Sequence, residues 1–172
     1  MRHTISVLVE NEFGVLARVA GMFSGRAFNI ESLSVAETLD PTVSRMTLVT
    51  RGDDQVLAQV ERQLEKLVPV IKVTDFTDTP HVERELVLIK VAADDATRSE
   101  LLNIVDIFRA KIIDVSRRCF IVETTGSEDK VNALIELLKP IGITEIVRTG
   151  KVAMFRGTGT FTTEGKDKDR AA

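Results

Sequence analysis

The sequence predicts an α+β protein of two consecutive units, each with the element order β-α-β-β-α-β. Two observations support this prediction. Strand-like and helix-like apolar segments occur twice in the same order, and a polar, turn-rich stretch at residues 77–81 separates the two series. A chain of 172 residues with 44% hydrophobic residues also has enough apolar material for two small cores. Each unit should form a four-stranded antiparallel sheet with both helices on one face.

The first unit begins with a strand and ends with one. Alternating apolar residues predict strands at 5–9, 30–36, 43–50 and 70–76. Helical spacing of apolar residues predicts two helices, with stripes formed by Leu16, Val19, Ala20, Phe23 and Ala27, and by Leu57, Val60, Leu64 and Leu67. Asp53 or Asp54 should cap the second helix, and Pro69 should end it.

The second unit repeats this order. Strands are expected at 86–91, 111–116, 119–124 and 143–147. Residues 97–100 have the capping-box pattern and should open the first helix of this unit. Ser127 should cap the second helix, and Pro140 should stop it. The arrangement expected for both units is therefore ferredoxin-like.

The same patterns set the domain boundaries. We expect an N-terminal domain at 1–77, a linker at 78–83, a C-terminal ferredoxin-like domain at 84–155 and a mobile tail at 156–172. The tail is rich in glycine and charge, a composition that is poor at packing a core. Because units of this size bury only a modest fraction of their surface, we also expect pairing of units or of chains.

Composition argues against several functions. A net charge of −3 and the absence of Trp and Tyr disfavour a nucleic-acid binder. The single cysteine, Cys119, cannot form an intrachain disulfide and fits a reducing cytosol, so we expect a cytoplasmic protein. The N-terminus passes directly into a strand without a leader segment, and no apolar run is long enough for a membrane span.

The turn between the first strand and the first helix is the main candidate site. Asn11 and Gly14 lie on it, where a helix start offers free backbone N–H groups and a positive dipole end that suit a carboxylate. A second loop contains Asn29, whose amide oxygen could receive an ammonium group. We expect both loops to emerge at one end of the sheet and to bind a free amino acid. Asn and Gly are also ordinary turn residues, so a purely structural role remains the alternative that this spacing alone leaves open.

Other chemistry has weaker support. His3 and His81 lack the spacing of metal ligands, and Cys119 has no evident histidine partner for nucleophilic catalysis. A small acylphosphatase-like enzyme would need an arginine in a glycine-rich anion loop. Arg18 instead falls on the predicted helix, which makes that geometry doubtful.

Three segments of the first unit resemble a known family. Residues 5–19 (ISVLVENEFGVLARV), 23–33 (FSGRAFNIESL) and 44–47 (SRMT) are similar to the ACT domain of the small regulatory subunit of acetolactate synthase, also called acetohydroxyacid synthase. Residues 81–86 (HVEREL) and 110–115 (AKIIDV) resemble the second domain of the same subunit. The resemblance covers about residues 1–157, and only the tail departs from it.

The resemblance implies a regulatory subunit that is not itself an enzyme. Its partner would be the catalytic large subunit, which holds thiamine diphosphate, Mg²⁺ and FAD, so no cofactor is expected in this chain. The small subunit would form a homodimer through its ACT domains and bind valine, leucine or isoleucine at the seam. The effector-binding residues implied are Asn11, Gly14, Val15, Leu16, Asn29 and Ile30. The alternative is an ACT sensor that regulates another enzyme or transcription.

Overall fold

The computed structural model describes residues 1–163, which form two compact units. The first unit contains Met1–Val82 together with the described part of the C-terminal segment that begins at Lys151, and the second contains Glu83–Gly150. The sequence analysis assigned residues up to 155 to the second domain. Residues 151–155 instead group with the first unit by their contacts.

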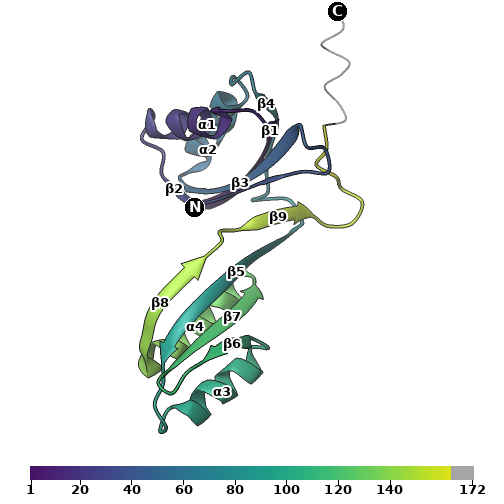
Figure 1. Ribbon diagram of the computed structural model, residues 1–172. Coiled ribbons are helices and arrows are strands. Elements are labelled where there is room, and N and C mark those ends of the chain that lie inside the picture. The colour runs from purple at the N-terminus through teal and green to yellow at the C-terminus, as the bar shows by residue number, and fades with distance from the viewer. Residues whose placement is uncertain (164–172) are drawn as a thin grey trace, which may run out of the picture. The chain divides into compact units, whose positions relative to one another are not determined.

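The first unit has a four-stranded antiparallel sheet with two helices on one face (Figure 1). Its strand order is β2-β3-β1-β4, as expected for the predicted ferredoxin-like fold. Its elements are β1 (Arg2–Glu10), α1 (Val15–Ser24), β2 (Ile30–Glu37), β3 (Val43–Arg51), α2 (Asp54–Leu64) and β4 (Val70–Asp75). Strand β2 is therefore an edge strand.

The second unit repeats the topology, with strand order β6-β7-β5-β8. Its elements are β5 (His81–Ala92), α3 (Arg98–Ile107), β6 (Lys111–Val115), β7 (Cys119–Gly126), α4 (Glu128–Gly142) and β8 (Ile143–Arg148). A further strand that was not predicted, β9 (Val152–Phe155), groups with the first unit and pairs with β5, whose first two residues belong to the same unit. The α+β fold class is thus confirmed.

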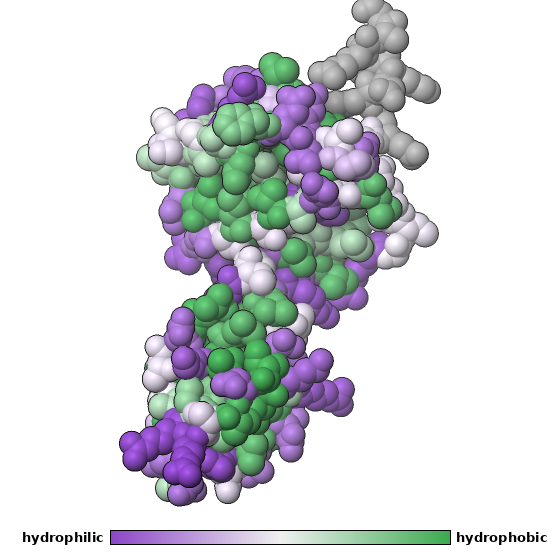
Figure 2. Space-filling view, viewed as in Figure 1, coloured by the Kyte–Doolittle hydropathy of each residue, from purple (hydrophilic) through white to green (hydrophobic). Residues whose placement is uncertain are grey.

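Each unit has its own core between its sheet and its helices. In the first, Ile5, Val7 and Val9 of β1 point toward the buried faces of α1 and α2. In the second, Val87, Ile89 and Val91 of β5 do the same toward α3 and α4. Alternate residues of β5 face away from the helices, and Figure 2 shows hydrophobic side chains gathered over the strands of this unit.

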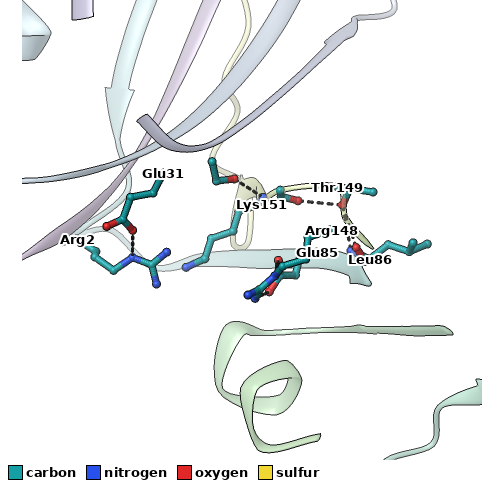
Figure 3. Close-up of polar contacts among 9 residues, drawn as sticks. Arg2, Glu31, Glu85, Leu86, Arg148, Thr149 and Lys151 are labelled. Atoms are coloured by element: carbon teal, nitrogen blue, oxygen red, sulfur yellow. Dashed lines mark hydrogen bonds and ion pairs between the residues drawn. The ribbon is translucent and has the colours of Figure 1, made fainter. Parts of the chain in front are cut away.

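Two polar contacts tie strands together within the units. Glu31 of β2 forms an ion pair with Arg2 of β1 (Figure 3). It forms another with Arg51 of β3, and both arginines lie at the end of the sheet where β1 begins. In the second unit, Glu85 of β5 is only 4% exposed and pairs with Arg148 of β8. A buried carboxylate requires such a partner, because desolvation without one is unfavourable.

Predictions about helix ends were partly wrong. Asp53 caps α2 as expected, accepting a hydrogen bond from the Val56 N–H at 2.9 Å. The capping box at 97–100 does not form. Instead, Asp94 accepts hydrogen bonds from the backbone N–H groups of Ala96 and Thr97. Pro140 does not stop α4, which continues to Gly142 because burial of Leu138 and packing of Ile141 against the core outweigh one lost hydrogen bond.

Part of the segment predicted to be a mobile tail packs on the first unit. Phe161 is 8% exposed and packs against Leu8 and Val43 of the first unit. Glycine and charged residues dominate the composition of this segment, but Phe161 is a large apolar residue among them and can be buried. The rest of the predicted tail, from residue 164, lies outside the described residues.

Candidate functional site

The turn between β1 and α1 places Gly14 at the N-cap of the helix. Its backbone is left-handed, with φ of 81°, a conformation that glycine adopts without strain. A Cβ at this position would meet no atom within 4 Å. The backbone angle therefore favours glycine here, and the space beside it is open in the described chain.

Asn11 fastens this turn to the hairpin between β2 and β3. Its backbone N–H donates to the carbonyl oxygen of Thr42 at 2.7 Å. Its side-chain amide donates to the carbonyl oxygen of Pro41 at 2.9 Å and to the carboxylate of Glu37 at 3.3 Å. Since both amide hydrogens are engaged within the chain, the group that Asn11 offers to a ligand is its acceptor oxygen.

The start of α1 differs from that of the other three helices in the described chain. As in α3 and α4, no side chain caps it, but among the described helices only α1 has no acidic residue in its first turn. The first turns of α2, α3 and α4 all contain at least one Asp or Glu. The first N–H groups of a helix have no intrahelical partner and carry a positive partial charge. The start of α1 is therefore open to an anion.

The corresponding loop of the second unit is already filled by its own carboxylate. Asp94 precedes α3 and accepts hydrogen bonds from both the N–H and the hydroxyl of Thr97, each at 2.9 Å. These bonds hold the pKa of Asp94 below its ordinary value of 3.8. An external carboxylate would therefore compete with an internal one, so the two units are not equivalent as anion sites.

The loop with Asn29 is shaped by the end of α1. Ala27 has a φ of 57°, the Phe28 N–H donates to the carbonyl oxygen of Phe23, and the Ala27 N–H donates to that of Ser24. This is a Schellman motif with alanine where glycine is usual. The Asn29 carbonyl accepts from the Thr50 hydroxyl at 2.7 Å, which fixes the loop to β3 while the Asn29 side chain stays exposed.

The two candidate loops lie at opposite ends of the sheet. Ile30, which follows Asn29, pairs with Thr50, and Thr50 also pairs with His3 near the start of β1. Asn11 follows the other end of β1, where Glu10 pairs with Val43. At about 3.3 Å per residue, these ends are about 23 Å apart. The expectation that both loops emerge at one end is therefore wrong, because α1 returns the chain along the length of the sheet.

The remaining predicted residues differ in exposure. Val15 is 3% exposed and Ile30 is partly buried, and both pack with the core of the first unit. Leu16 is 44% exposed beside the open start of α1. The sequence analysis did not include Val35, which is 41% exposed on edge strand β2. Val35 is two residues after Leu33 on β2, so the strand pattern places both on the face of the sheet that the helices cover.

Other kinds of site find no support in the described residues. Arg18 lies within α1 and is exposed, so it does not complete an anion loop of the acylphosphatase kind. Within residues 1–163, no three His, Cys, Asp or Glu side chains gather as a metal site. None of the helices in this range is long and apolar enough to cross a membrane.

Comparison with known proteins assigns this architecture. The fold and the open β1–α1 turn define an ACT-type regulatory protein, and residues 5–72 match the family model for the AHAS small subunit-like ACT domain. Residues 84–157 match the model for the small subunit of acetolactate synthase. The chain belongs to the acetolactate synthase small-subunit family.

Similar proteins cover nearly the whole chain. A probable acetolactate synthase small subunit of Archaeoglobus fulgidus is 57% identical over 157 residues, which is 91% of this chain and 98% of that protein. The acetolactate synthase small subunit of Haemophilus influenzae is 51% identical over 158 residues, covering 91% and 97%. The crystal structure of the Thermotoga maritima small subunit superposes with a TM-score of 0.83 at 45% identity, covering 92% and 99%.

Proposed function

We propose that this chain activates the catalytic subunit of acetolactate synthase and makes it sensitive to feedback by branched-chain amino acids. The effector is valine, with leucine or isoleucine as related ligands. It binds where the ACT units of two copies meet. The chain performs no chemistry itself. The partner subunit carries the thiamine diphosphate, Mg²⁺ and FAD and condenses pyruvate with a second 2-keto acid, and both subunits work in the cytoplasm.

The distance between the loop with Gly14 and the loop with Asn29 is the observation that supports a binding site between two copies of the chain. A free amino acid is only a few ångströms long and cannot touch both Gly14 and Asn29 of one chain. Strand β2 is an edge, with backbone groups free to pair with another copy. Antiparallel pairing of two such edges brings the Gly14 end of one copy beside the Asn29 end of the other. Each dimer then has two equivalent composite sites.

The groups at such a site match the parts of a branched-chain amino acid. The open N–H groups at the start of α1 receive the carboxylate, and the space beside Gly14 admits it. The acceptor oxygens of Asn11 and of the partner copy's Asn29 loop receive the ammonium. Leu16 and Val35 supply exposed apolar surface for the side chain.

The interaction energies suit a sensor. Hydrogen bonds to charged groups contribute about 1.5–3 kcal/mol each, and burial of a branched side chain contributes about 1.5–3 kcal/mol. Loss of ligand freedom and ordering of the loops offset part of this. The resulting affinity falls in the micromolar to millimolar range of metabolite levels. Because the ligand binds only the paired arrangement, it shifts an equilibrium between states of the complex.

Reconstitution tests this function directly. The chain is co-purified with its catalytic subunit, and acetolactate formation from pyruvate is measured with and without valine, leucine and isoleucine. We expect no turnover by the chain alone, increased turnover by the complex and inhibition by at least one of the three. Turnover by the chain alone would contradict the non-catalytic role. A complex insensitive to all three amino acids would contradict the effector assignment.

A further inference from the structure

The C-terminal segment, residues 151–161, contacts all four strands of the first unit's sheet on the face without helices. The backbone N–H of Lys151 donates to the hydroxyl of Ser32 on β2 at 3.1 Å. Arg45 of β3 donates to the carbonyl oxygen of Ala153 at 2.6 Å. Phe161 packs on Leu8 of β1, and Ile71 of β4 lies against the same cluster. A change in the arrangement of any of these four strands would therefore alter a contact of the segment.

Two of the described contacts of Arg45 are with this segment, one with the Ala153 carbonyl oxygen and one with the Phe161 ring. Its Nε donates to the hydroxyl of Ser6 at 3.0 Å, and its guanidinium lies 5.1 Å from the centre of the Phe161 ring. The Nζ of Lys72, on β4, lies 5.4 Å from the centre of the same ring. None of the described partners of Arg45 is a carboxylate, and burial lowers its pKa. A carbonyl oxygen and a ring face are thus the groups that stabilise this half-buried cation.

The seat of Phe161 adjoins the candidate effector turn. Leu8 lies on β1 three residues before Asn11, which follows that strand, and Val43 follows Thr42, whose carbonyl accepts the Asn11 N–H. A shift of the turn on ligand binding would therefore move both residues that seat the ring. At its other end, the segment is joined through Gly150 to β8, the last strand of the second unit's repeated fold.

We propose that the C-terminal segment is a conformational link that transmits the state of the effector turn to the second unit. When effector orders the turn, Leu8 and Val43 hold Phe161 in its seat, and the segment stays packed on the sheet up to Lys151, the residue that follows Gly150. When the turn is unliganded, the seat is looser and the segment is released more readily. This proposal rests on the proposed effector function. It adds the route by which effector binding at the turn affects the second unit.

The test uses the reconstituted holoenzyme with Phe161→Ala in the regulatory chain. We expect activation of the catalytic subunit to persist. The valine concentration for half-inhibition should rise by about 5- to 150-fold, the usual range of allosteric coupling. Ile107→Ala, which trims a residue 76% exposed on α3, is the matched control and should behave as wild type. A wild-type response in Phe161→Ala would overturn the link while leaving the effector site intact. A wild-type complex whose activity does not change with any branched-chain amino acid would contradict both the link and the proposed effector function.

A second readout does not depend on activity. The natural chain contains no tryptophan, so Phe161→Trp introduces a single fluorescent reporter. We expect its emission at shorter wavelength than that of an Ile107→Trp control, and we expect valine to shift the first and not the second. Emission equal to the exposed control, or a Phe161→Trp signal that saturating valine leaves unchanged in an inhibited holoenzyme, would contradict the link.

Discussion

Gly14 and Asn29 lie at opposite ends of the sheet of the first unit, on loops joined by the length of α1. Each belongs to a loop with its own anchor, Asn11 to Pro41 in one case and Asn29 to Thr50 in the other. No change of side-chain rotamer closes a gap of about 23 Å between two strand ends. A ligand that needs both loops therefore needs two copies of the chain.

Gly14→Asp should abolish inhibition by valine while preserving activation. The left-handed backbone tolerates Asp better than most residues, and the added side chain has open space, so the fold survives. The new carboxylate would occupy the start of α1 and repel that of the ligand. The measurement is valine binding by calorimetry, alongside inhibition of the holoenzyme.

Gly14→Asn separates charge from shape in this experiment. Asn tolerates the same backbone and has the same size as Asp but is neutral. It should weaken valine binding less than Gly14→Asp does. Equal loss in both variants would show that space rather than charge governs the site, and wild-type affinity in both would show that Gly14 is outside it.

Ala27→Gly should stabilise the first unit. Ala27 has a φ of 57° at the end of α1, where glycine avoids the strain, so we expect a gain of about 0.5–1 kcal/mol in the free energy of unfolding. Ala58→Gly, inside α2, is the control in which glycine should destabilise the fold, and we expect its free energy of unfolding to fall by about 1 kcal/mol. Both are measured by denaturant unfolding. A loss of stability in Ala27→Gly would mean that the left-handed geometry carries no penalty.

Removing Arg148 should destabilise the second unit more than removing the pair. Glu85 is 4% exposed, and the Nε of Arg148 donates to its carboxylate at 3.0 Å. Arg148→Met leaves a buried charge unpaired and should lose about 2–3 kcal/mol, less than a fully buried pair because the Arg148 side chain is 40% exposed. The double variant with Glu85→Gln should recover part of this in a thermodynamic cycle. Additive losses would rule out coupling between the two residues.

Acid should remove the contribution of Asp94 to stability. Hydrogen bonds from Thr97 lower its pKa in the folded state below the ordinary 3.8, so the folded state binds the proton less well than the unfolded state. The stabilisation is present above that value and is lost as pH falls through the lowered pKa. Asp94→Asn should therefore be less stable than wild type at pH 7, and the difference should shrink at lower pH. A difference that grows in acid would reverse the assignment.

The sequence predicted what local periodicity determines. Alternation along residues such as Ile5, Val7 and Val9 revealed the strands, and helical spacing of Val19 and Phe23 revealed α1. The topology followed because the order of elements leaves few arrangements with both helices on one face. The position of Gly14 between β1 and α1 was also predicted correctly, because a glycine between strand and helix is a local signal.

Long-range contacts were not predictable in the same way. Phe161 meets Leu8 and Val43 from more than a hundred residues away, and no local pattern encodes that pairing. The capping box at Thr97 failed for a local reason, because Asp94, three residues earlier, accepts the hydrogen bond from the Thr97 N–H that Glu100 would accept in the box. The direction in which each loop leaves the sheet depends on the path of α1, which the motif alone does not show.

Mixing two defective chains measures the composite site most directly. Gly14→Asp and Asn29→Ala chains are each expected to bind no valine, and they are then combined and allowed to exchange subunits. In a mixed dimer, one site contains both substitutions and the other contains neither, so random pairing restores about a quarter of the wild-type sites. Calorimetry of the mixture should therefore show high-affinity binding that neither parent shows. If the mixture binds no more valine than its parents do, the effector does not lie between two chains.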